Sequence, residues 1–177
     1  MLTTHRLPAR TFLLAACAVA VTVQFAFSAH AEPSSADRTT GTADESVLDV
    51  LQRYNSAEVE YLENGNFAPV RAVFAPDAVV YQAAGLPYGG EHRGHAELEA
   101  ALAGVRETWS EIEVLEANSV EDGPVAAVWE RVRFVSRHTG RELTTEVFAR
   151  VTVKDGLIVE SRPFYLDTAA VQRAITP

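Results

Sequence analysis

The segment RELTTEVFARVTVKDGLIVESRPFYL, residues 141–166, carries the strongest structural signal in the chain. Its two halves are rich in β-branched and aromatic residues that alternate with polar ones, which is typical of half-buried strands. Between them lies Lys154-Asp155-Gly156, and Asp-Gly is a dipeptide that favours hairpin turns. The segment therefore predicts two antiparallel strands, over 141–153 and 157–166.

The register of this hairpin depends on the length of its turn. A two-residue turn pairs Lys154 with Leu157, whereas a three-residue loop pairs Val153 with Leu157. The three-residue loop separates apolar from charged residues and sets Arg150 opposite Glu160 on the outer face, so we expect this register. The residues that it turns inward are Val147, Ala149, Val151, Val159, Ser161, Tyr165 and Asp167.

The inward face carries small side chains at its centre. Ala149 and Ser161 lie there, where a tightly filled core would carry larger side chains. We expect these two residues to leave a cavity under the helices that cover the sheet. The cavity would end at Tyr165 and Asp167, which supply a phenol and a carboxylate.

The rest of the chain supplies helices first and strands afterwards. Apolar residues at steps of three and four predict a long helix over about 44–64, which Asn64-Gly65 ends. Further expected elements are a short helix over 67–74, a strand over 78–82, a glycine-rich loop over 85–94, a helix around 98–105, strands over 109–117 and 125–136, and a helix over 168–175. This order indicates an α+β domain, in which a curved antiparallel sheet is covered by three helices from the N-terminal half and followed by a short C-terminal helix.

The N-terminal segment has the pattern of an export signal. Arg6 and Arg10 precede an almost unbroken apolar run, and Ala29-His30-Ala31 has the small-x-small pattern that signal peptidase cleaves. We therefore expect cleavage after Ala31 and a secreted or otherwise extracytoplasmic protein.

Three regions follow from this cleavage site. Residues 1–31 form the signal peptide, residues 32–43 a small and polar disordered tether, and residues 44–177 a single domain. An alternative remains open at Cys17, because Leu14-Ala15-Ala16-Cys17 matches the box at which bacterial lipoproteins are lipidated. In that case the protein would be a lipoprotein anchored through Cys17.

The composition argues against several kinds of partner. The chain of 177 residues has a net charge of −9, and its sequence has no cluster of basic residues that could bind a phosphate backbone. We therefore expect no nucleic-acid partner. Cys17 is the only cysteine, and no two histidines have the spacing of metal ligands, so we expect no bound metal. The sequence also lacks a phosphate-cradling loop, and we expect no cofactor.

Three motifs carry a family resemblance. They are Leu86-Pro87-Tyr88-Gly89-Gly90-Glu91-His92-Arg93-Gly94, Lys154-Asp155-Gly156-Leu157-Ile158-Val159 and Phe164-Tyr165-Leu166-Asp167-Thr168-Ala169-Ala170. With the order of elements, they resemble the SnoaL-like branch of the nuclear transport factor 2-like superfamily over about residues 44–175. The resemblance implies a cone, in which a curved sheet and helices enclose a deep pocket, and often a dimer. Members include ketosteroid isomerases, polyketide cyclases, dehydratases and proteins without catalysis, so the fold alone does not name an activity.

The ketosteroid isomerase residue set is absent from this chain. The positions that resemble its oxyanion-hole tyrosine, its proton-transferring aspartate and its second acid hold Glu58, Gln82 and Ala149. If the protein is an isomerase, cyclase or dehydratase-like acid/base enzyme, it therefore does not use that set. In polyketide cyclases the general acid/base is an aspartate late in the sheet, and Asp167 resembles it.

Two carboxylates are the catalytic candidates, and each has a structural alternative. Glu58 lies on the apolar stripe of the first helix, where it either projects into the pocket or lies at the solvent-exposed edge of the stripe. Asp167 directly precedes the last helix and is well placed to cap it, which is the favoured interpretation, although the two roles are compatible. The expected pocket residues are Tyr54, Tyr61, Tyr81, His92, Ala149, Ser161 and Tyr165.

Two functional hypotheses follow from these residues. The first is an exported domain that binds a hydrophobic small molecule in an apolar pocket, with acid/base chemistry on a carbonyl compound if it is an enzyme. Tyr54 or Tyr165 would then polarise the carbonyl oxygen. The second is an association module, in which the outer sheet face around Phe148, Arg150 and Phe164 forms a homodimer or docks a partner.

Overall fold

The computed structural model describes residues 45–177. The expected signal peptide over 1–31, the tether over 32–43 and the lipidation box at Cys17 lie outside the described residues, so they stay predictions. Within residues 45–177, no helix has both the length and the apolar character needed to cross a membrane.

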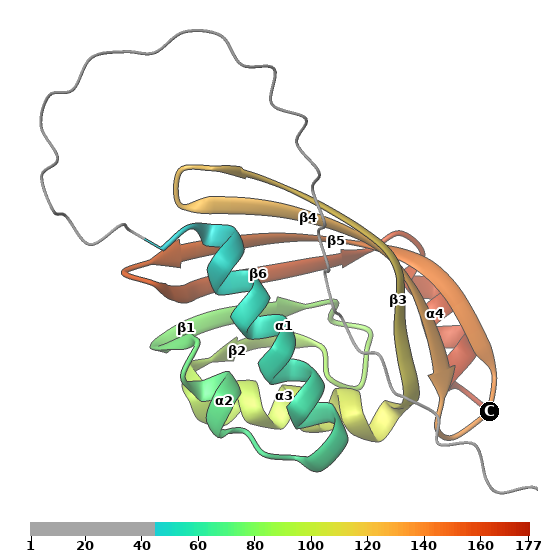
Figure 1. Ribbon diagram of the computed structural model, residues 1–177. Coiled ribbons are helices and arrows are strands. Elements are labelled where there is room, and N and C mark those ends of the chain that lie inside the picture. Colours follow the sequence, from blue (N-terminus) through green and yellow to red (C-terminus); the bar gives the residue numbers. More distant parts are fainter. Residues whose placement is uncertain (1–44) are drawn as a thin grey trace, which may run out of the picture.

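A single curved sheet and four helices make up the described part of the chain (Figure 1). The elements are α1 (Val47–Asn64), α2 (Ala68–Arg71), β1 (Phe74–Gln82), β2 (Gly90–Arg93), α3 (Gly94–Thr108), β3 (Trp109–Asp122), β4 (Val125–Ser136), β5 (Glu142–Lys154), β6 (Leu157–Tyr165) and α4 (Thr168–Ile175). The strands follow the order β2-β1-β6-β5-β4-β3, and the two edges of the sheet do not meet. The expected α+β class, with helices in the N-terminal half and a short C-terminal helix, is confirmed.

The sheet departs from the expected all-antiparallel pairing at one place. Strand β1 runs parallel to β6, and Val80 lies opposite Ser161 in that pair. The other neighbouring strands are antiparallel. Parallel strands need a long crossover connection, and here the whole segment from β2 to β5 supplies it. The parallel pair therefore joins the first strand of the fold to its last one.

Helix α1 has a defined start and stop. The Ser46 side chain accepts a hydrogen bond of 3.2 Å from the Asp49 N–H, so the helix begins at Val47 and not at residue 44. It ends at Gly65, whose φ of 79° is left-handed and whose N–H donates to the Tyr61 carbonyl. These two caps set the bounds of α1.

Strand β1 begins earlier than expected. Residues 67–74 were expected to be helical, but α2 is only one turn long and Phe74 already pairs with Ile158 of β6. Pro76 lies within β1, at the irregularity between Phe74 and Val79 where the pairing with β6 is interrupted. Proline is tolerated in strands at such places because no ladder hydrogen bond is lost.

The expected glycine-rich loop over 85–94 contains a strand that the sequence did not indicate. Strand β2 is four residues long and pairs with β1, with Val80 opposite His92. An isolated strand of this length carries almost no alternation signal, so it forms because β1 offers an open edge. His92 therefore belongs to a strand and not to a loop.

The expected turn of the β5–β6 hairpin was wrong. Asp155 and Gly156 have φ values of 51° and 73°, which are typical of a two-residue turn, and Lys154 pairs with Leu157. A bulge then inserts one extra residue, Val159, into β6.

The bulge explains why most of the expected inward residues nevertheless share one face, although Val159 is itself the bulged residue and Asp167 lies beyond β6 and outside the pocket lining. Beyond the bulge, Ala149 lies opposite Pro163 and Val151 opposite Ser161, two residues further along β6 than the expected partners. A shift of two keeps every side chain on the same face, whereas a shift of one would have turned them all over. Arg150 still forms an ion pair of 2.7 Å with Glu160, although the two residues are not directly opposite.

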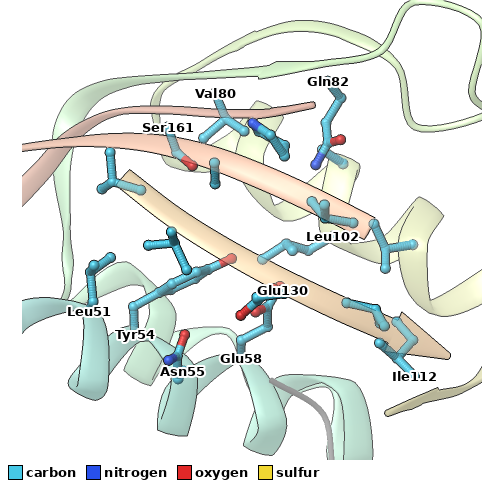
Figure 2. A pocket seen from close by; sticks show the side chains of 18 of the residues that line it. Leu51, Tyr54, Asn55, Glu58, Val80, Gln82, Leu102, Ile112, Glu130 and Ser161 are labelled. Carbon is cyan, nitrogen blue, oxygen red and sulfur yellow. The ribbon is translucent and has the colours of Figure 1, made fainter. Parts of the chain in front are cut away.

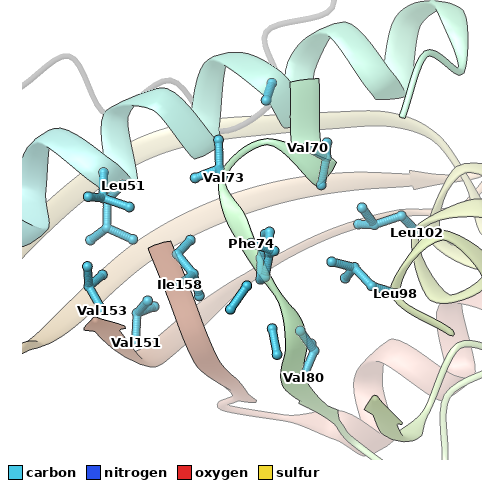
Figure 3. Close-up of a cluster of buried hydrophobic side chains, with 14 of the residues drawn as sticks. Leu51, Val70, Val73, Phe74, Val80, Leu98, Leu102, Val151, Val153 and Ile158 are labelled. Carbon is cyan, nitrogen blue, oxygen red and sulfur yellow. The ribbon is translucent and has the colours of Figure 1, made fainter. Parts of the chain in front are cut away.

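The concave side of the sheet holds a pocket between two apolar clusters (Figure 2). The first cluster joins α1, α2, β1 and the β5–β6 hairpin, and Figure 3 shows Leu51, Val73, Phe74, Val153 and Ile158 packed together in it. Ile158 is only 1% exposed, and burying such a side chain contributes roughly 1.5–3 kcal/mol. The second cluster joins β3, β4 and α4 to the loop before β2. The hollow between the clusters is the candidate site.

Candidate functional site

The pocket is an apolar cavity of about 150 Å³ with a few polar groups in its wall. An engineered cavity of about this size takes up benzene, so a single ring or a short branched chain sets the scale of its ligand. The polar residues of its lining are Tyr54, Asn55, Glu58, Gln82, Glu130, Ser161 and Tyr165. Ala149 and Ser161, the two small inward residues of the hairpin, both line it.

Glu58 reaches the pocket from α1. Tyr54 lies one turn before it on the same helix, and the two side chains are hydrogen-bonded. Leu51 and Leu62 line the pocket from the same face of α1, so the helix turns its apolar stripe with Glu58 toward the cavity. Of the two placements that the sequence left open for Glu58, the structure therefore has the one inside the pocket.

Glu130 is a pocket residue that the sequence analysis missed. It lies on β4, where Ala126, Val128, Val132 and Phe134 share its inward face. Every second residue of a strand faces the same side, so a carboxylate among alternating apolar residues could have been predicted to face inward. It went unnoticed because no inward face was assigned to this strand.

The two carboxylates have perturbed acidities. Burial raises the pKa of Glu58 from 4.5 to about 7; the hydrogen bond with Tyr54 lowers it and the negative charge of Glu130 raises it further. Burial also raises the pKa of Glu130. Figure 2 shows the two side chains pointing into the same part of the pocket, from α1 and from β4. Near neutral pH the pair therefore retains a proton that exposed glutamates would lose.

The positions matched to the ketosteroid isomerase residues meet in this pocket. Glu58, Gln82 and Ala149 all line it, although each differs from the isomerase residue. The Oε1 atom of Gln82 is buried and has no hydrogen-bond partner among the described residues. A buried acceptor without a donor is costly, so Gln82 offers the pocket an unused acceptor.

Tyr165 links the pocket to the second apolar cluster. Its hydroxyl lies 3.4 Å from the Tyr88 hydroxyl, which also accepts a hydrogen bond of 3.0 Å from Trp109 Nε1. Burial raises the pKa of Tyr88, so this chain of groups stays neutral. The three aromatic residues hold the end of the pocket in place.

A family model for the SnoaL-like domain matches residues 51–161, which is more than half of the chain. The protein belongs to the SnoaL-like domain family. The matched segment runs from α1 to β6 and includes Glu58, Gln82, Glu130 and Ala149. The resemblance seen in the sequence motifs is thereby confirmed.

Solved structures share the fold of this SnoaL-like domain. A nuclear transport factor 2-like protein from Burkholderia xenovorans LB400 has 26% identity and a TM-score of 0.64, with 74% of this chain and 98% of that one covered. A protein from Jannaschia sp. CCS1 described as a SnoaL-like polyketide cyclase has 19% identity and a TM-score of 0.63, with 73% and 92% covered. These values support the cone-shaped fold.

A more distant structure has the same fold. It is a protein from Catenulispora acidiphila with a ketosteroid isomerase-like fold, in complex with trimethylamine, at 11% identity and a TM-score of 0.58, with 73% of this chain and 94% of that one covered. At this identity the likeness concerns the fold alone. No functionally curated protein matches the sequence.

Asp167 lies outside the pocket lining of the SnoaL-like domain. Its side chain accepts a hydrogen bond of 2.8 Å from the Ala170 N–H and so caps α4. It also lies 3.6 Å from Arg173, and about half of its side chain is exposed to solvent. The capping role that the sequence favoured is the one this geometry supports.

Three expected pocket residues also lie elsewhere. Tyr61 is buried against Phe67, with ring centroids 6.0 Å apart, between α1 and α2. Tyr81 lies under the guanidinium of Arg162, which is 3.9 Å from the ring centre. His92 Nε2 is 3.0 Å from the Tyr88 carbonyl and anchors the loop before β2. Of the expected set, Tyr54, Ala149, Ser161 and Tyr165 line the pocket.

No metal centre can be built from the described residues. Within 45–177, no three acidic, histidine or cysteine side chains come together in a way that would hold a metal ion. The polar groups that line the pocket are carboxylates, hydroxyls and amides.

Proposed function

We propose that this protein is an exported small-molecule-binding domain whose pocket gains or loses a proton when its ligand binds. The observation that carries the proposal is the pair of largely desolvated carboxyl groups, Glu58 and Glu130, in one mainly apolar cavity. Buried acids without basic partners are costly to the fold, so a purely structural pocket would carry apolar residues at these positions. Clusters of perturbed acids in a cleft are typical of functional sites.

Glu58 has the acidity that proton exchange needs. A general acid/base works best when its pKa lies near the operating pH, and the pKa of Glu58 is about 7. Tyr54 orients the carboxyl group through their hydrogen bond. Glu58 acts as the acid/base in this proposal, and Glu130 tunes it through its charge.

The ligand is small and mainly hydrophobic, in keeping with a cavity of about 150 Å³ and an aliphatic lining. Ser161 and Tyr165 offer hydroxyl groups to its polar atom at the β6 side of the pocket. The sequence assigned the acid/base role to either Glu58 or Asp167, and the capping contacts of Asp167 favour Glu58.

The proposal is tested by titrating the Glu58 carboxyl by NMR, with assignment through the Glu58→Gln variant. We expect a transition near pH 7 that shifts when a fragment library of small hydrophobic compounds supplies a ligand. The matched control is Glu63→Gln, an exposed acid at the end of the same helix. A Glu58 transition near its ordinary value, together with no bound fragment, would overturn the proposal.

A second candidate function is association of two copies through the outer sheet face. Trp129, Phe148 and Phe164 are neighbours across β4, β5 and β6 on this face, and Phe148 and Phe164 are 45% and 52% exposed. The neighbouring Arg150 and Glu160 supply both signs of charge, so the patch is complementary to itself in a two-fold dimer. The two functions are compatible, because the strand residues that line the pocket lie on the opposite face of the sheet.

A further inference from the structure

The polar groups of the pocket are unbalanced in charge. Among the described residues that line it, the titratable ones are Glu58, Glu130, Tyr54 and Tyr165, and none is basic. The Tyr54 side chain is hydrogen-bonded to Glu58. Within residues 45–177, no ion pair reaches Glu58 or Glu130. In the part of the chain that the structure describes, the site therefore holds two potential negative charges and no cation that balances them.

The remaining acceptors strengthen this imbalance. No donor from residues 45–177 reaches the buried Oε1 of Gln82, and the amide of Asn55 lines the pocket from the same helix as Glu58. A ligand that satisfies these groups must bring hydrogen-bond donors, and one that neutralises the carboxylates must bring a positive charge.

We infer that the natural ligand of this pocket is a small hydrophobic ammonium ion, with its nitrogen between Glu58 and Glu130 and its hydrocarbon part against the aliphatic wall. This inference rests on the proposed function and names its ligand class. An ammonium group has donors only, and it pairs with a carboxylate more strongly in a desolvated site than in water.

Binding of such an ion displaces the proton that the pair holds. The protonated carboxyl of Glu58 releases H⁺ to the solvent, and the resulting carboxylate pairs with the unchanged ammonium group. Because the pKa of Glu58 is about 7, the affinity should rise about tenfold between pH 6 and pH 8. A neutral ligand gains nothing from ionisation of Glu58 and should lose affinity over the same range.

Isothermal titration calorimetry with two matched probes tests the inference. Cyclopentylammonium and cyclopentanone have the same ring, and differ in carrying a charged donor or a neutral acceptor. We expect cyclopentylammonium to bind at least tenfold more tightly at pH 8. At pH 6, titrations in buffers of different ionisation enthalpy should show about one proton released per bound ion.

Two variants identify the groups responsible. Glu58→Gln and Glu130→Gln should each weaken cyclopentylammonium binding at least tenfold, and Glu58→Gln should abolish the proton release. Glu63→Gln, on the exposed end of α1, should bind as the wild type does. Removing a buried carboxyl does not threaten folding, because the amide has the same shape and no charge to desolvate.

The outcomes separate the inference from the proposed function. Equal or tighter binding of cyclopentanone, with Glu58 still titrating near pH 7, would overturn the ammonium ligand and leave the proton-exchanging pocket intact. If neither probe binds, the ammonium ligand is likewise overturned. An ordinary Glu58 titration in that second case would remove the proposed function as well.

Discussion

Glu58 on α1 and Glu130 on β4 lie in one pocket, where the charge of Glu130 adds to the burial that raises the pKa of Glu58 to about 7. The two residues are far apart in the sequence, and neither has a basic neighbour among the described residues that line the pocket. Their juxtaposition opposes folding at neutral pH, which is how many binding and catalytic sites differ from a packed core.

Replacement of Glu58 should make the protein more stable at high pH. An acid whose folded pKa lies above its unfolded value stabilises the fold below pH 4.5, and that advantage is lost as the pH rises to about 7. The unfolding free energy of Glu58→Gln should therefore equal that of the wild type near pH 4.5. At pH 8 it should be larger by at most about 3 kcal/mol. Urea unfolding at both pH values measures the difference. A constant difference between the two would contradict the burial of this carboxyl.

Removal of the Glu130 charge should make Glu58 more acidic. The charge of Glu130 raises the pKa of Glu58, so Glu130→Gln should lower it below about 7. NMR titration of the Glu58 carboxyl in both proteins measures the shift. Glu146→Gln, an acid on the neighbouring strand that accepts from Trp129 Nε1 away from the pocket, is the control and should leave the titration unchanged. An unaltered Glu58 in Glu130→Gln would show that the two groups are not coupled.

A larger side chain at Ala149 should fill the pocket. Ala149→Leu places three more carbons in the cavity, so binding of small ligands should fall at least tenfold, while the melting temperature changes by only a few degrees. Ala127→Leu, on the outer face of β4 opposite Arg150, is the matched control and should retain binding. Thermal shift and calorimetry measure both effects. Undiminished binding to Ala149→Leu would place the ligand outside this pocket.

Asp167 should matter for stability and not for ligand binding. Its carboxylate caps α4 through the Ala170 N–H, so Asp167→Ala should cost about 1 kcal/mol in unfolding free energy. Asp167→Asn keeps an acceptor and should restore most of the loss. Ligand affinity should be the same in all three proteins. A selective loss of binding or turnover in the stable Asp167→Asn variant would instead revive its role as an acid/base.

Charge on the outer sheet face should disrupt any dimer. Phe164 is 52% exposed and lies opposite Phe148, so Phe164→Arg would bring a charge to the centre of the patch. We expect sedimentation equilibrium to show a dimer of the wild type and a monomer of this variant. Val120→Arg, which alters an exposed residue near the β3–β4 turn, should remain dimeric. A monomeric wild type would rule out the association function.

Local patterns were sufficient for most of the elements. β4 and α4 begin and end where the sequence predicted, because alternation and the capping residue Asp167 are encoded within a few neighbouring residues. The failures concern pairing: β2, the early start of β1 and the bulge at Val159 each depend on a partner strand that is distant in sequence. Hydrogen bonds to such partners leave no periodic trace in the sequence itself.

The sequence alone was enough to establish the family, the α+β order of elements and the small residues Ala149 and Ser161 on an inward face, because these follow from short-range patterns and motifs. The three-dimensional arrangement was needed to bring Glu130 beside Glu58 and to leave Asp167 outside the pocket. A carboxylate in a strand looks the same in the sequence whether it faces solvent or a cavity. Its acidity depends on desolvation and on the charges around it, and both arise only when distant elements pack together.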